Sequence, residues 1–215
     1  MLDYIIIIYW LLTYLLLFFG FNMSKNNTIM LVAFIHATII TALSSIVLYS
    51  YDIQFNRPNM LIEIIISKLS FWYFINDLIL LLIFDRDLIY IIHHLCASIT
   101  LYTTLNMGFG LSSCMLILFL GEITNPFRLA KQMIYEHNKI TYSILNFIFS
   151  WLFLLVRCIA MTYYYILMIN NFIPHINDQT NKYTILVTTT LGLLGGYGWS
   201  WMLLKKKIKL LKKDD

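Results

Sequence analysis

Long apolar stretches separated by short polar segments fill almost the whole chain. Each stretch is about 18 to 28 residues long. At a rise of about 1.5 Å per residue, about 20 helical residues cross the roughly 30 Å hydrocarbon core of a bilayer. The pattern therefore predicts seven transmembrane helices, at Tyr4–Phe21, Thr28–Ser50, Met60–Phe84, Leu88–Asn106, Gly108–Met133, Thr141–Met168 and Tyr183–Leu204.

The composition agrees with this pattern. The chain has 215 residues, of which 60% are hydrophobic and only 12% are charged, and its mean hydropathy is +0.76. Soluble proteins carry about 25% charged residues, so a water-soluble fold is excluded. Because the loops are short, we expect a single all-α domain, a polytopic membrane helix bundle.

The basic residues indicate how this bundle is oriented. With seven spans, eleven Lys and Arg residues fall on one side of the membrane, and only Arg57 and Lys182 fall on the other. Basic loop residues are concentrated in the cytosol, so we expect a lumenal N-terminus and a cytosolic C-terminus. The first span is expected to be a retained anchor, because it lacks the basic segment that opens a signal peptide. The eleven cytosolic residues are Lys25, Arg86, Arg128, Lys131, Lys139 and the six lysines of residues 205–215.

The tail, residues 206–215, ends in two lysines followed by two aspartates. Lys212 and Lys213 stand four and three residues from the end, and this spacing resembles the dilysine signal that coat proteins recognise. We therefore expect a multi-pass protein of the endoplasmic reticulum membrane, with a coat protein as a partner. The alternative is that the lysines only act as a stop-transfer charge cluster.

Two sequons for N-glycosylation, at Asn22 and Asn26, follow the first span. The predicted topology places both in a cytosolic loop, which the glycosylating enzyme does not reach. We therefore expect both asparagines to stay unmodified.

The cysteines and the net charge set aside other classes of protein. Cys96, Cys114 and Cys158 lie inside apolar stretches without CxxC spacing, so neither a disulfide framework nor a cysteine zinc site is expected. The formal net charge is +4, but six of the fifteen basic residues lie in the last eleven positions. This distribution indicates membrane topology, with contact to lipid headgroups, and not nucleic-acid binding.

Seven ionisable side chains inside the apolar stretches are candidates for a buried role. A charged group near the bilayer centre costs at least about 2.5 kcal/mol, so each needs a partner, a cavity or a function. Counted from the cytosolic ends of the spans, five share a layer about 7 to 12 Å deep, whereas Lys68 and Arg157 come out deeper. The five are His36, Asp77, His93, His94 and Glu122.

This layer contains the residue types of a buried acid/base site. Imidazoles titrate near neutrality, and carboxylates can orient them. We take His93, His94, Asp77 and Glu122 as candidate catalytic residues. On a helix the side chains of His93 and His94 diverge by about 100°, so one can face a cavity while the other contacts a neighbouring helix. The alternative is that these groups only form interhelical hydrogen bonds.

The remaining ionisable residues are candidate lipid-binding residues. Lys68 and Arg157 are expected to be ion partners within the bundle or contacts to lipid headgroups, and His36 is grouped with them. No bound metal or cofactor is expected. The alternative is a metal site, which no HExxH-like spacing supports, built from His36, Asp77, His93 and Glu122.

Three segments together resemble the TLC domain family, the domain shared by TRAM, ceramide synthases and CLN8. Residues 71–82, FWYFINDLILLL, resemble the family's aromatic-rich helix with an aspartate, here Asp77. Residues 88–97, LIYIIHHLCA, resemble its double-histidine helix. Residues 121–133, GEITNPFRLAKQM, are similar to its acidic segment with a Pro-Phe pair.

The resemblance also implies a division of the chain and a branch of the family. In ceramide synthases an acidic segment of HDxxxD type follows the double histidine. Here Gly121, Glu122 and Asn125 stand where that pattern has His, Asp and Asp, so the chain resembles the CLN8-like and TLCD-like branch more closely. The implied parts are two N-terminal helices with a weak match (1–50), a core of five helices (60–205) and the basic tail (206–215).

The resemblance implies a role with membrane lipids. In one reading, acyl-CoA enters a cavity from the cytosol as a co-substrate, and its acyl group passes to a sphingoid base or a lysolipid. His94 or His93 would act as the general base or nucleophile, with Asp77 orienting it. The alternative is a non-catalytic lipid sensor, lipid carrier or cargo receptor of the endoplasmic reticulum.

Overall fold

The computed structural model describes residues 1–84, 88–135 and 138–211, without the side chains of Phe84 and of residues 206–211. In these ranges 87% of the residues are helical, and no strand occurs. An isolated antiparallel bridge joins Pro58 to Phe109. The predicted all-α fold is confirmed.

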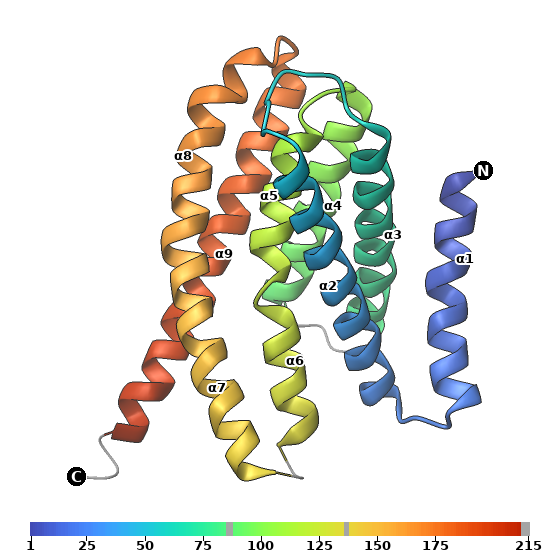
Figure 1. Cartoon of the computed structure of the whole chain (residues 1–215), viewed down its shortest axis with the longest axis vertical. Helices are drawn as coiled ribbons and strands as arrows, with labels where there is room; N and C mark the ends of the chain where they lie inside the picture. Colours follow the sequence, from blue (N-terminus) through green and yellow to red (C-terminus); the bar gives the residue numbers. More distant parts are fainter. Residues whose placement is uncertain (85–87, 136–137, 212–215) are drawn as a thin grey trace.

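Most of the helices run along the long axis of the molecule, and the end of α9 lies at the opposite end of the bundle from the turn between α8 and α9 (Figure 1). A π-helical turn, η1, extends α1, and a second one, η2, joins α7 to α8. The helices are α1 (Leu2–Leu15), η1 (Leu16–Gly20), α2 (Lys25–Ser50), α3 (Leu61–Phe84), α4 (Leu88–Met107), α5 (Leu111–Glu122), α6 (Asn125–Ile134), α7 (Lys139–Leu154), η2 (Leu155–Ala160), α8 (Met161–Asn171), η3 (Ile173–His175, a 3-10 turn) and α9 (Gln179–Leu211).

Five helical segments of the described chain are long and apolar enough to cross a membrane, which agrees with the predicted polytopic membrane protein. The predicted spans Gly108–Met133 and Tyr183–Leu204 are not among them. The first corresponds to α5 and α6, which are separate short helices, and the second lies within α9, which is long but less apolar. The five segments are Leu2–Gly20, Lys25–Ser50, Leu61–Ile83, Leu88–Met107 and Lys139–His175.

The predicted span Gly108–Met133 is interrupted in the structure. Helix α5 ends at Glu122 and α6 begins at Asn125, with Pro126 in its first turn. Proline has no N–H group and its ring clashes with the carbonyl group four residues earlier, so a helix running through this point would be broken. The break places Glu122 and Asn125 on either side of a short turn that faces the centre of the bundle.

Asn59 ties together the helix ends that lie opposite the C-terminus. Its amide NH₂ donates to the carbonyl oxygen of Thr104 at 3.3 Å, and its side-chain oxygen accepts from the backbone N–H of Leu111 at 2.9 Å. The turn that it holds contains Gly110 at φ +91°, a conformation that favours glycine. A Cβ atom at this position would also lie 2.4 Å from the Phe172 ring. These contacts fix the start of α5 relative to α4.

Helix α1 lies at the edge of the bundle and packs against α3 (Figure 1). Trp10 is fully buried and donates its indole N–H to the carbonyl oxygen of Leu69 at 3.0 Å. Nearer the N-terminus, Asp3 accepts hydrogen bonds from Lys68 at 2.7 Å and from the indole of Trp72 at 2.9 Å. Lys68 is therefore an ion partner within the bundle, one of the two roles expected from the sequence.

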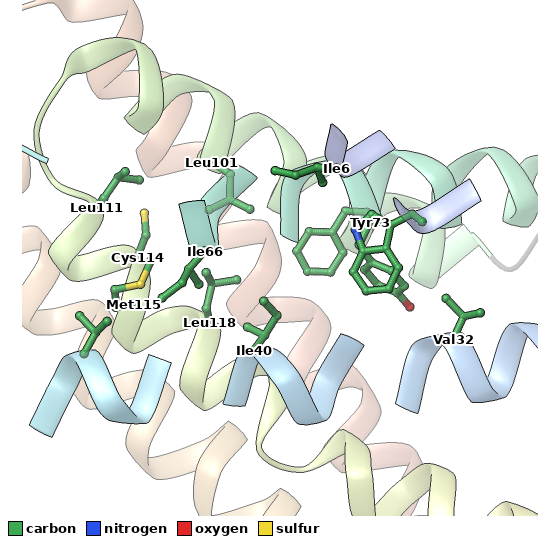
Figure 2. Close-up of a cluster of buried hydrophobic side chains, with 13 residues drawn as sticks. Ile6, Val32, Ile40, Ile66, Tyr73, Leu101, Leu111, Cys114, Met115 and Leu118 are labelled. Atoms are coloured by element: carbon green, nitrogen blue, oxygen red, sulfur yellow. The ribbon is translucent and has the colours of Figure 1, made fainter. Parts of the chain in front are cut away.

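A cluster of buried apolar side chains joins α1, α2, α3, α4 and α5 (Figure 2). Ile40 of α2, Ile66 of α3 and Met115 of α5 are all fully buried within it. Burial of an aliphatic side chain away from solvent stabilises a fold by about 1.5–3 kcal/mol in water, and dispersion contacts replace this term inside a bilayer. This packing holds α3 and α4, the two helices of the candidate site, against α5.

Candidate functional site

A polar cavity of about 760 Å³ lies between α2, α3, α4, α6, α7, η2 and α9. Lys25 and Asn26 at the start of α2, and Met202 and Leu203 late in α9, line one side of it. The cavity therefore extends toward the end of the bundle that carries the C-terminus (Figure 1). Its ionisable lining includes Asp77, His93, His94, Glu122, Arg128 and Arg157.

A smaller pocket of about 90 Å³ lies deeper, between α3, α4, α5, η2, α8 and α9. Most of its lining is apolar, and Gly121 and Gly192 leave space where other residues would place a side chain. The residues that line both the polar cavity and this apolar pocket are Phe74, His93, Glu122 and Arg157. The two spaces therefore meet at these four residues, His93 among them, which suits a ligand with one polar and one apolar end.

His94 is held at both of its ring nitrogens. Nδ1 lies 2.9 Å from the carbonyl oxygen of Tyr90, and Nε2 lies 3.0 Å from Oδ2 of Asp77. A carbonyl oxygen only accepts, so Nδ1 carries the hydrogen. The second hydrogen bond then contains one proton, either on Nε2 facing an ionised Asp77 or on the carboxyl group facing a neutral imidazole. The pair of Asp77 and His94 has no net charge in either state. Both ring nitrogens of His94 are occupied by these hydrogen bonds, so neither is free to bind a ligand.

His93 lies on the next position of α4 and faces a different environment. Its ring makes edge contacts with His94 and Trp199, with centroids 5.6 and 5.2 Å away. Within the described residues, neither of its ring nitrogens has a hydrogen-bond partner. His93 thus has ring nitrogens without a hydrogen-bond partner in the described structure, whereas both ring nitrogens of His94 are anchored.

Glu122 is buried at the end of α5 and accepts a hydrogen bond from the amide of Asn125 at 2.9 Å. Its Oε2 atom also lies 3.9 Å from Nδ1 of His36, which is longer than a hydrogen bond. The His36 ring stacks on Tyr73 with a centroid distance of 3.7 Å and an interplanar angle of 11°. His36 lies behind Glu122 and lines neither cavity. Its position supports Glu122 and Tyr73 and gives no direct contact to a ligand.

Arg157 lies in the π-helical turn η2 and is only 4% exposed. One of its Nη atoms donates to the carbonyl oxygen of Gly121 at 2.8 Å, and the guanidinium group stands over the Phe153 ring at 5.5 Å. Its side-chain stem packs against Gly196 of α9. A π-helical turn inside a longer helix is frequently found at a functional site. This turn brings a cation to the wall shared by the two cavities.

Residues 26–205 match the TLC domain family. This chain belongs to the TLC domain family. It is also 27% identical over 158 residues to TLC domain-containing protein 4 A from Dictyostelium discoideum, and the similar region covers 70% of the chain and 60% of that protein. The chain thus spans about 60% of the length of this curated relative. The resemblance inferred from the three motifs is confirmed, and the relative's name agrees with a TLCD-like branch.

The TLC domain brings together residues that are far apart in the sequence. Four of the five residues that were expected to share one depth line the polar cavity, and the fifth, His36, lies next to Glu122. Arg157 was expected at a different depth, yet it lines the same cavity. Lys68 lies outside both cavities and is bonded to Asp3.

Two residues of the TLC domain site were missed from the sequence. Arg128 was counted only as a cytosolic charge, but its guanidinium group lines the polar cavity and donates to the Tyr90 hydroxyl at 3.2 Å. Trp199 lines the cavity beside His93. Arg128 lies seven residues after Gly121 in the motif GEITNPFRLAKQM, so its place next to the acidic segment was a usable signal.

In the described part of the chain, no group of three or more His, Cys, Asp or Glu side chains is arranged to hold a metal ion.

Proposed function

We propose that this TLC-domain protein transfers an acyl group from acyl-CoA to a sphingoid base or a lysolipid, with His93 as the reacting residue. The observation that carries the proposal is the position of His93 at the junction of the polar cavity and the apolar pocket, with both ring nitrogens free of hydrogen bonds in the described structure. An acyl-CoA has the same two-part character, because a charged carrier is joined to an apolar chain.

The chemistry follows from the lone pair of a neutral imidazole. A ring nitrogen of His93 either attacks the thioester carbonyl, expelling CoA as its thiolate, or removes the proton of the attacking amine or hydroxyl group. In the first route the acyl-imidazole passes its acyl group to the acceptor, and the acceptor's proton neutralises the thiolate. Asp77 holds His94 in place, and His94 in turn packs against the His93 ring. Glu122 at the same junction is placed to accept a proton from an amine.

The test is acyl transfer by the purified protein. The protein is reconstituted in liposomes made from a total lipid extract and given palmitoyl-CoA with a radiolabelled acyl chain. We expect the label to appear in extractable lipid, and transiently on the protein in a form that hydroxylamine releases. If neither lipid nor protein becomes labelled with any sphingoid base or lysolipid, the enzyme proposal fails, and the cavity is that of a lipid sensor, carrier or cargo receptor.

We further propose that the chain crosses the membrane seven times, with a lumenal N-terminus and a cytosolic C-terminus. Helix α9 has 33 residues, about 50 Å at 1.5 Å per residue, which is enough to cross a bilayer. Helices α5 and α6 together extend from Leu111 to Ile134 and run in series through the bundle (Figure 1). The positive-inside distribution then supports the cytosolic tail.

This topology predicts the glycosylation pattern. Asn22 and Asn26 should stay unmodified in cells, whereas the change Gln179→Thr should create a modified sequon at Asn177, which is exposed between α8 and α9. The measurement is a mass shift that an endoglycosidase removes. The control adds Asn177→Gln to the same variant and should abolish the shift. A glycan on the native Asn22 or Asn26 would reverse the proposed orientation.

The proposed residence in the endoplasmic reticulum rests on Lys212 and Lys213, which lie outside the described residues. Replacing both with serine should allow a fluorescently tagged protein to move beyond the endoplasmic reticulum, because the coat protein no longer binds the tail. The measurement is colocalisation with Golgi and plasma-membrane markers. The control replaces Lys206 and Lys207 with serine, which removes the same charge from the tail. If both variants keep the wild-type distribution, the two terminal lysines act only as topology charges.

A further inference from the structure

Arg157 is a buried cation that forms no ion pair with a carboxylate of the described residues. Within the described chain, no Asp or Glu oxygen lies within 4.0 Å of its guanidinium nitrogens. Among the residues that the structure describes, its buried Nε atom has no hydrogen-bond partner, and its Nη atoms make one hydrogen bond, to the carbonyl oxygen of Gly121. A buried guanidinium group that has lost water is costly unless an anion or several acceptors compensate it. The structure therefore leaves Arg157 able to bind an anion.

Arg128 adds a second guanidinium group to the same cavity. Its hydrogen-bond partner in the described structure is the neutral Tyr90 hydroxyl, and no carboxylate lies within ion-pair distance. Both guanidinium groups are close enough to interact electrostatically with His93. Asp77 is already paired with His94, so Glu122 is the remaining carboxylate that faces these cations in the cavity. The described lining thus favours an anionic ligand.

We propose that Arg157 and Arg128 bind the phosphate group of an amphiphilic ligand, whose apolar chain lies in the pocket beyond His93. Guanidinium groups present a planar set of N–H donors that matches the oxygens of a phosphate. Arg157 lines the polar cavity and also the apolar pocket, so a phosphate bound there has its chain at the entrance of the apolar pocket. The phosphate belongs either to a lysophospholipid or to the CoA portion of an acyl-CoA.

The proposal is tested by binding to the full-length protein in detergent micelles, without any turnover. The two probes are oleoyl lysophosphatidate and monooleoylglycerol, which carry the same chain with and without a phosphate. We expect the wild-type protein to bind the phosphate-bearing probe at least about tenfold more tightly. Arg128→Gln and Arg157→Gln should each reduce this preference by about tenfold, whereas Arg157→Lys should keep part of it.

The matched control is Lys139→Gln, which removes an exposed cation at the start of α7 and should leave the preference unchanged. Coenzyme A, added as a competitor, distinguishes the two sources of the bound phosphate, a lysophospholipid and an acyl-CoA. Displacement of lysophosphatidate by micromolar coenzyme A assigns the site to the acyl-CoA phosphates, and a lack of displacement assigns it to a lipid headgroup.

The proposal is overturned if the wild-type protein binds both probes equally, or if folded Arg128→Gln retains the full preference. Should Arg157→Gln fail to fold, the wild-type comparison and Arg128→Gln still decide the outcome. This proposal specifies a ligand for the proposed acyl transfer, and it rests on the role with membrane lipids that was proposed above. Because the assay measures binding only, a protein that transfers no acyl group can still support it, and an active transferase can still contradict it.

Discussion

His93→Ala is expected to abolish acyl transfer while leaving the fold intact. Removal of a general base or nucleophile from a reacting centre lowers the rate by about 10²- to 10⁴-fold. The stability should change little, because the His93 nitrogens have no hydrogen bond in the described structure and the ring faces the cavity. The measurements are the initial rate of label transfer from palmitoyl-CoA to lipid and the apparent melting temperature of the protein in detergent.

The matched controls lie on the same helix. Ile92→Ala changes the preceding residue, whose side chain is 41% exposed on the outer surface, and should alter neither the rate nor the melting temperature. Asp77→Asn should keep the fold and lower the rate, because it changes the proton shared with His94 and loosens that ring against His93. A His93→Ala protein with wild-type transfer would show that His93 is not the reacting residue.

The helices could be predicted from the sequence because apolar length is a direct consequence of bilayer thickness. The interruption between α5 and α6 was missed although Pro126 marks it, because apolar residues such as Phe127 and Leu129 recur beyond the proline. A transmembrane helix also tolerates proline when neighbouring helices satisfy the freed backbone groups, so proline alone did not decide the matter. The break matters for the site, since it places Glu122 at a helix end.

The candidate site could be predicted only as a set of residues at similar depths. Depth follows from position along a helix, but the rotation of the helix decides which residue faces a cavity. His93 and His94 are equivalent by depth, and only the contact of His94 with Asp77 on α3 distinguishes them. Arg157 came out deeper in the same count, and a count along one helix could not predict that it lines the same cavity as Glu122.

The paired side chains of Asp77 and His94 should give the largest effect on stability. Both are only 7% exposed, and their hydrogen bond of 3.0 Å joins α3 to α4. Replacing one partner leaves the other buried without compensation, which costs about 3–5 kcal/mol. We therefore expect Asp77→Leu and His94→Leu each to reduce the yield and the free energy of unfolding in mixed micelles. The double variant should be no less stable than either single variant, because it leaves no unpaired polar group.

The comparison is made as a double-mutant cycle with a second ion pair as its control. Asp3 and Lys68 join α1 to α3 at 2.7 Å, but their side chains are 39% and 26% exposed. An exposed pair contributes about 0–1 kcal/mol, so the cycle on Asp3 and Lys68 should give a coupling energy in that range. The coupling energy for Asp77 and His94 should instead reach at least about 3 kcal/mol, because each single variant loses about 3–5 kcal/mol and the double variant loses no more than one of them. Equal coupling energies in the two cycles would mean that Asp77 does not anchor His94. The distinct roles of His94 and His93 would then have no structural basis.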